Sequence, residues 1–193
     1  MMINTKTIGS TRTLTLCGLF AALTAIGAFI KIPLPPPLVP FTLQFLFCAL
    51  AGVLLGAKLG ALSQLIYVLV GLVGIPVFTE GGGLHYIFKP TFGYLIGFII
   101  GAYVIGVCIE KFKEINFKNL FKASLIGLIV VYALGVVYMY VIYNFYIGNE
   151  MGVWTAIWGG AISCAPGDIL LCVLTAVMGV KMIPVLRKNR LTA

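Results

Sequence analysis

The sequence predicts an all-α integral membrane protein with six transmembrane helices and both termini in the cytoplasm. Three observations lead to this fold class. First, the 193-residue chain is 61% hydrophobic and only 9% charged, whereas soluble domains carry roughly 25% charged residues. Second, six apolar segments approach the ~20 residues that a helix needs to cross a bilayer. Third, six crossings place most basic residues on one side of the membrane. We therefore expect one membrane domain covering residues 1–193.

The six apolar segments define the predicted spans in chain order. They cover residues 13–30, 41–57, 59–73, 91–109, 120–143 and 153–185. Only Lys58 separates the second span from the third, so we expect a tight hairpin there, with Gly56 and Gly60 supplying the turn. The last span is predicted to be interrupted at Pro166, because proline lacks an N–H and favours the first turn of a helix.

The positions of the basic residues set the predicted orientation. The side shared by the two termini would hold Lys6, Arg12, Lys58, Lys111, Lys113, Lys118, Lys122, Lys181, Arg187, Lys188 and Arg190. The other side would hold only Lys31 and Lys89. Since basic residues favour cytoplasmic loops, this asymmetry places both termini in the cytoplasm. It also explains the net charge of +8 without a nucleic-acid partner.

The two longest outer connections, residues 31–40 and 74–90, are predicted to be lids. The first is rich in proline, which makes it stiff and extended. The second is apolar at both ends and has three consecutive glycines at 81–83. Because such segments would expose apolar side chains in water, we expect both to fold back over the helix bundle.

Small residues recur four positions apart in three rows. The rows are Gly52, Gly56 and Gly60; Gly93, Gly97 and Gly101; and Ala21 and Ala25 beside Gly18 and Ala22. Such rows let helix backbones approach closely, either within this chain or against another protein. The first span is the best candidate for packing against a partner.

The reactive groups of the chain are too few for an enzyme. Asp168 is the only carboxylate within a predicted span, so no carboxylate pair is available for acid–base catalysis. Motifs for a serine nucleophile, a zinc site or a phosphate loop are missing. The five cysteines and His85 lack metal-site spacing. We therefore expect a binding protein with no cofactor and no metal, which takes energy for uphill transport from a partner.

Asp168 is the most informative polar residue, because charges are costly at membrane depth. A helix restarting near Pro166 would place it in the first turn, where the helix dipole favours an anion. The functional alternative is a binding site, and an ionised aspartate would suit a ligand with N–H donors.

Three further polar residues have two interpretations each. Thr42 and Gln44 open the second span, where they cap a helix end or face a polar ligand. Lys89 lies at the mouth of the fourth span, where it extends to the interfacial water or binds a ligand carboxylate. Together, Asp168 and Lys89 suggest a ligand with N–H groups at one end and an acid at the other.

A resemblance to a known family is carried by four stretches in a fixed order. They are VPFTLQFLFCALAGVLLGAKLGALSQLIYVLVGLVGIPVF, then GGG, then KPTFGYLIGF, then APGDILL. The chain thus resembles the biotin-specific substrate-binding (S) components of energy-coupling factor (ECF) transporters, the BioY family. The match extends from the first span to the last, and FTLQ, GIPVF and PGD are specific in this combination and order.

The resemblance implies an ECF S-component fold with a high-affinity biotin site near the outer face. It implies a transmembrane coupling (T) protein and two ATP-binding subunits as partners. It also implies that the chain lies in the cell membrane of a prokaryote, in contact with membrane lipid. The coupling protein would contact Ala21 and Ala25. Asp168 and Gln44 would accept hydrogen bonds from the ureido N–H groups of biotin, and Thr42 would belong to the same binding site.

The remaining site residues follow from the same resemblance. Tyr67 and Tyr86 would supply aromatic walls with Phe41 and Tyr94, and Gly82 would let a lid approach the ligand closely. The family pattern has a lysine where this chain has Leu171 and a glycine where it has Lys89. We therefore expect Lys89 to bind the biotin carboxylate.

Two other functions are weighed against this one. The first is an S component for another vitamin, against which the FTLQ and PGD pair argues. The second is an integral membrane enzyme acting on lipids, against which the missing catalytic groups argue.

Overall fold

Helices make up most of the chain, as its apolar segments predict. The computed structural model describes residues 11–35, 38–112 and 114–188. Lys6, Lys113 and Arg190, which contributed to the predicted orientation, lie outside the described residues, as do positions 36–37 of the first predicted lid.

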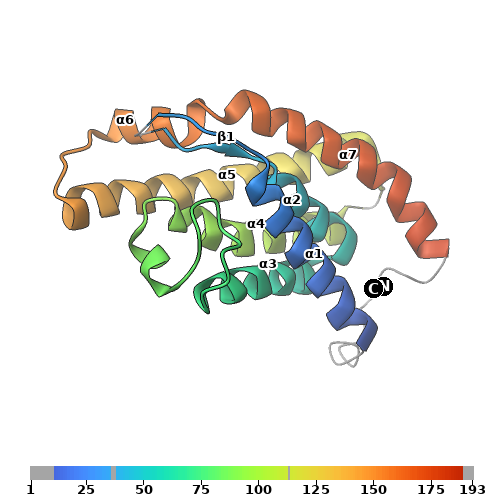
Figure 1. Cartoon of the computed structure of the whole chain (residues 1–193). Helices are drawn as coiled ribbons and strands as arrows, with labels where there is room; N and C mark the ends of the chain where they lie inside the picture. Colours follow the sequence, from blue (N-terminus) through green and yellow to red (C-terminus); the bar gives the residue numbers. More distant parts are fainter. Residues whose placement is uncertain (1–10, 36–37, 113, 189–193) are drawn as a thin grey trace.

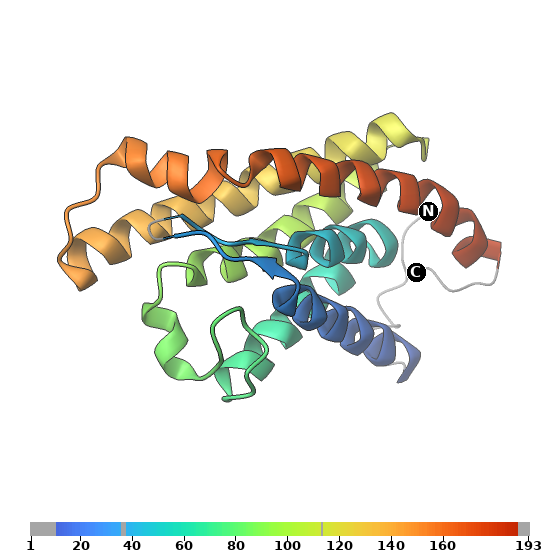
Figure 2. The same ribbon diagram turned by 45° about the horizontal axis from the view of Figure 1, so that its top comes forward.

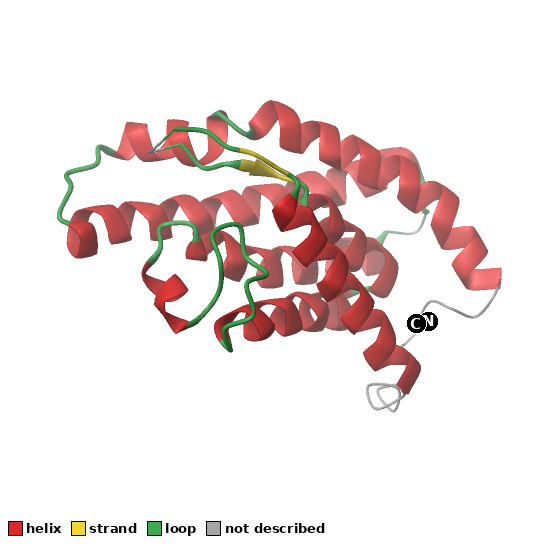
Figure 3. Cartoon of the chain, in the orientation of Figure 1, coloured by secondary structure: helices red, strands yellow, loops and turns green. Residues whose placement is uncertain are grey.

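The elements follow one another in a simple order, shown in Figures 1 and 3. They are α1 (Thr11–Phe29), β1 (Lys31–Ile32), β2 (Phe41–Thr42), α2 (Gln44–Leu55), α3 (Ala57–Leu72), the 3₁₀ helix η2 (Leu84–Phe88), α4 (Phe92–Lys111), α5 (Phe117–Val141), the π-helical turn η3 (Ile142–Ile147), α6 (Val153–Ile157), the π-helical turn η4 (Trp158–Ile162) and α7 (Ala165–Lys188).

Four helical stretches in the described part of the chain are long and apolar enough to cross a membrane. They are Thr11–Phe29, Phe92–Lys111, Phe117–Ile147 and Val153–Leu186. The helices α2 and α3 are apolar but have only 12 and 16 residues. At 1.5 Å per residue they are shorter than the ~30 Å hydrocarbon core of a bilayer. A mostly helical chain with four candidate spans is therefore established, and six crossings stay a prediction.

Helix α2 lies at the centre of the bundle. It packs against α1, α3, α4 and α7, and nearly all of its side chains are buried. Gly56 alone connects α2 to α3, with φ at 81°, whereas Gly60, which was also expected in the turn, lies within α3. Glu110 of α4 accepts a hydrogen bond from the first N–H of α3, with 2.9 Å between Oε1 and Ala57 N. This carboxylate satisfies one of the unpaired donors at a helix N-terminus.

The glycine row of α4 packs within the chain. A Cβ at Gly97 would lie 3.0 Å from Cα of Val131, and one at Gly101 would lie 2.8 Å from its Cγ2. The backbones of α4 and α5 therefore approach closely at Val131, as small-residue rows allow. Likewise, a Cβ on Gly60 of α3 would lie 2.9 Å from Cα of Gly52 on α2.

The start of the second predicted span is not helical. Phe41 and Thr42 form strand β2, which pairs antiparallel with β1, so that Thr42 lies opposite Lys31. Thr42 is also not the N-cap of α2, since Leu43 holds that position without a side-chain hydrogen bond. The strand pair satisfies backbone groups of an apolar connection that would otherwise lack partners. The preceding Pro40 cannot donate to a helix and favours an extended neighbour.

The last predicted span is broken, as the proline predicted. The chain runs through α6 and η4, turns at Ser163 and Cys164, and restarts as α7 at Ala165. Asp168 lies in the first turn of α7. Helix α7 runs beside α5, and the segment from β1 to β2 lies alongside η4 (Figure 2).

Candidate binding site

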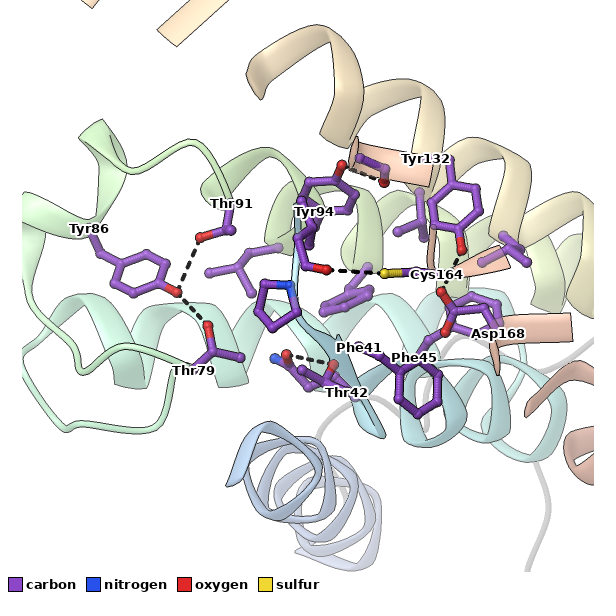
Figure 4. Close-up of a pocket in the computed structure, with 18 residues that line it drawn as sticks. Phe41, Thr42, Phe45, Thr79, Tyr86, Thr91, Tyr94, Tyr132, Cys164 and Asp168 are labelled. Carbon is purple, nitrogen blue, oxygen red and sulfur yellow. Dashed lines mark hydrogen bonds between the residues drawn. The ribbon is translucent and has the colours of Figure 1, made fainter. Parts of the chain in front are cut away.

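A cavity lies where the strand pair, the connection after α3 and the broken last helix meet. It is lined by Val39, Pro40, Phe41, Thr42, Gln44, Phe45, Thr79, Tyr86, Thr91, Tyr94, Leu95, Phe98, Leu128, Val131, Tyr132, Gly160, Cys164 and Asp168. Its free volume is about 60 Å³. Aromatic rings surround a few polar groups (Figure 4), which is the usual character of a small-molecule site.

Asp168 and Tyr132 form one end of the cavity. The Tyr132 hydroxyl, on α5, donates a hydrogen bond of 2.5 Å to Oδ2 of Asp168 (Figure 4). Asp168 is only 7% exposed. Among the hydrogen bonds between described residues, this is the one that the carboxylate accepts, so Oδ1 is available to a ligand.

The glycine of the PGD motif has a packing role beside this carboxylate. A Cβ on Gly167 would lie 2.5 Å from the ring of Phe41. Glycine at this position lets the Phe41 ring pack directly against the first turn of α7. The motif thus presents the carboxylate and its aromatic neighbour together.

Thr42 and Gln44 begin a chain of hydrogen bonds that leaves the cavity toward the second lid. The Thr42 hydroxyl donates to Oε1 of Gln44 at 3.1 Å, and Nε2 of Gln44 donates to the Tyr67 hydroxyl at 2.7 Å. That hydroxyl donates to the carbonyl of Val77 at 3.0 Å. Tyr67 is 1% exposed and does not line the cavity. Gln44 therefore connects the wall of the cavity to the segment that covers it.

The second lid is anchored by aromatic packing and by hydroxyl groups. Phe78 is buried between Tyr67 and Tyr86, with ring centroids 5.5 Å and 4.5 Å away. The Tyr86 hydroxyl lies 2.9 Å from that of Thr79, and Thr91 donates to it at 3.3 Å. Connection 74–90 therefore contacts the helix bundle through Tyr67 and Thr91, and its role as a lid stays a prediction.

The first lid is attached to the broken last helix. The Cys164 thiol donates to the carbonyl of Val39 at 3.1 Å, and the N–H of Val39 donates to the carbonyl of Gly159 at 3.0 Å. The Tyr94 hydroxyl donates to Gly160 at 2.7 Å. Hydrogen bonds thus connect the π-helical turn η4 to the first lid at Val39 and to α4 at Tyr94, on both sides of the cavity.

The sequence matches the BioY family over residues 2–188. The chain belongs to the BioY family. It is 47% identical over 182 residues to the probable biotin transporter BioY of Lysinibacillus sphaericus, covering 94% of this chain and 91% of that protein. It is 41% identical over 172 residues to the biotin transporter BioY of Thermotoga maritima, covering 89% and 95%.

A solved structure supports the same fold. The crystal structure of the S-component for biotin from an ECF-type ABC transporter superposes with a TM-score of 0.79 at 28% identity, covering 94% of each chain. The BioY resemblance carried by the FTLQ, GIPVF and PGD stretches is therefore confirmed.

Three of the BioY site residues predicted from the sequence lie outside the cavity lining, namely Tyr67, Gly82 and Lys89. Lys89 forms an ion pair with Glu80, and its Nζ lies 5.4 Å from the centre of the Tyr86 ring. Gly82 packs against another part of the second lid, because a Cβ there would lie 2.3 Å from the carbonyl oxygen of Ile75. The structure thus brings together Thr42, Gln44, Tyr86 and Asp168 of the predicted set, and Tyr67 contacts Gln44.

Other residues of the cavity had no recognisable signal in the sequence. Tyr132 lies in a long apolar helix with several tyrosines, and its spacing does not distinguish it. Thr79 and Thr91 are isolated hydroxyl residues in the second lid and before α4. In the described part of the chain, no three His, Cys, Asp or Glu side chains are grouped to hold a metal ion.

The predicted partner contacts on α1 are unevenly exposed. Ala21 is 7% exposed and belongs to the core of the bundle, and Ala25 is half-buried. The small residues that face outward are Gly18 and Ala22. No other atom lies within 4 Å of a Cβ built on Gly18. A bulky residue at Ala21 would therefore disturb this BioY fold itself.

Proposed function

We propose that this chain is the biotin-binding S component of an ECF vitamin uptake transporter, and not an enzyme. The observation that carries the proposal is the buried carboxylate of Asp168 at the end of an aromatic cavity, in a chain of the BioY family. Two relatives that match this chain over most of its length are named biotin transporters.

The chemistry of biotin matches the groups around the cavity. Its ureido N–H groups would donate to Asp168, whose Oδ1 is available. The rings of Phe41, Tyr94 and Phe98 would enclose the apolar thioether ring. Both lids would cover the bound ligand.

We propose six membrane crossings with both termini in the cytoplasm of a prokaryotic cell, and the cavity near the outer face. The distribution of lysine and arginine supports this orientation. The short helices α2 and α3 would cross as a pair, and α1 and α4 pack against both of them. Exposed apolar side chains on α1, α5 and α7 would contact lipid.

The transmembrane coupling protein and its two ATP-binding subunits would supply the energy. We propose that the coupling protein binds the face of α1 that carries Gly18 and Ala22, next to the half-buried Ala25. Ala22→Leu should leave biotin binding intact and prevent co-purification of the coupling protein. Survival of the complex would contradict this placement.

Calorimetry on the detergent-purified chain tests the proposed function. Biotin should bind with a saturable heat, its methyl ester more weakly, and riboflavin with no heat. If biotin gives no heat, the proposal is wrong, and binding of riboflavin instead would indicate an S component for another vitamin.

A further inference from the structure

The cavity at Asp168 is too small to hold a whole vitamin-sized ligand. Its free volume is about 60 Å³, whereas ligand pockets usually enclose roughly 300–1,000 Å³. A second cavity of about 320 Å³ adjoins it and shares Val39, Pro40 and Thr91 as lining residues. A ligand whose ring lies at Asp168 would therefore extend past these residues into the second cavity.

The two cavities differ in charge. The first contains Asp168 and no lysine or arginine among its lining residues. The second is lined by Lys31, from β1, and by Glu80, from the second lid. Glu80 is paired with Lys89, which lines neither cavity, so its negative charge is already offset.

The ammonium group of Lys31 has N–H donors that are available to a ligand. Its Nζ donates to the carbonyl of Thr79 at 2.6 Å. Within the described residues, no carboxylate lies within ion-pair distance of it. An ammonium group has three N–H donors, so two remain for an anion in the second cavity.

Lys31 also connects the two lids. It comes from the first lid, and the residue it contacts, Thr79, belongs to the second. The Thr79 side chain touches the Tyr86 hydroxyl, which lines the first cavity. An anion bound at Lys31 would thus lie at the junction where both lids close over the ligand.

We propose that Lys31 binds the carboxylate of the ligand, and that the second cavity holds the chain carrying this carboxylate. The proposal rests on the proposed function, because it assigns the acid end of a biotin-like ligand. It moves the cation expected at Lys89 to a residue with no carboxylate partner in the described chain.

Calorimetry with biotin and biotin methyl ester tests this proposal in three variants, Lys31→Met, Lys31→Arg and Lys89→Met. In Lys31→Met, biotin affinity should fall about 5- to 20-fold, between the effects of an exposed ion pair and a charge-assisted hydrogen bond. Its affinity for the ester should equal that of the wild type. Lys31→Arg should keep the preference for biotin over the ester, because it keeps the charge. Lys89→Met leaves Glu80 unpaired at the second cavity, so it should reduce this preference less than Lys31→Met does.

Three results would overturn the proposal. The first is unchanged biotin affinity in Lys31→Met. The second is an equal loss for biotin and ester in that variant, which would mean that Lys31 acts only through lid structure. The third is loss of the preference in Lys89→Met instead. Failure of the proposed function is separate, because the wild-type chain would then give no heat with biotin.

Discussion

The exchange of Asp168 for asparagine tests the deepest contact of the cavity. The variant keeps the size of the side chain and removes its charge. Tyr132 would continue to donate to the remaining oxygen, because its hydroxyl lies 2.5 Å from the Oδ2 position. The new amide N–H₂ would then occupy the position of Oδ1. A donor would thus face the N–H groups of the ligand, where an acceptor stood before.

The expected loss follows from this geometry. A hydrogen bond to a charged group contributes about 1.5–3 kcal/mol, and Asp168 is buried, so water does not replace it. Since 1.4 kcal/mol corresponds to tenfold in affinity, biotin should bind roughly 10- to 150-fold more weakly to Asp168→Asn. Tyr132→Phe keeps the charge and removes only the hydroxyl that orients it, so its loss should be smaller, about 2- to 10-fold.

Calorimetry with biotin measures both variants, beside a matched control. Glu150→Gln makes the same acid-to-amide exchange at an exposed carboxylate outside the cavity and should bind like the wild type. Wild-type affinity in Asp168→Asn would refute the reasoning and leave Asp168 only the role of an anion at the start of α7. A greater loss in Tyr132→Phe than in Asp168→Asn would mean that Tyr132 itself binds the ligand.

The lid and the hairpin supply two further predictions. Phe78→Ala removes the ring that anchors the second lid, so biotin should dissociate faster in a stopped-flow displacement assay, whereas Leu84→Ala, at a 69% exposed side chain of the same lid, should not change the rate. Glu110→Ala removes the acceptor for the Ala57 N–H and should destabilise the fold by about 1 kcal/mol, lowering Tm by about 2–4 °C. An equal shift for the exposed Glu114→Ala would count against a specific role of Glu110.

Some features of the site could be predicted because local sequence carries them. Pro166 predicts where a helix restarts, and that position places Asp168 in a first turn. Gly167 belongs to the same motif, but its close contact with the Phe41 ring depends on the tertiary structure. The proline-rich and glycine-rich connections predict lids, because apolar segments without helical periodicity must cover something.

Other features depend on which faces of distant segments meet. Tyr132 and Asp168 are 36 residues apart, and Lys31 and Thr79 are 48 apart. No local pattern links such pairs. The ion pair between Lys89 and Glu80 has the same origin, because the fold of the second lid brings Glu80 to Lys89.

The sequence by itself determined an apolar helical bundle, the break before α7 and the family, and it placed Asp168 in the first turn of α7. These follow from composition, proline and motif order, which act over a few residues or over the whole chain. Only the tertiary structure decided that Phe41 and Thr42 form a strand, that Tyr132 holds Asp168, and that Lys31 is the lysine at the second cavity. The physical reason is that backbone pairing and side-chain contacts between lids are set by packing, which brings together groups that the chain separates by tens of residues.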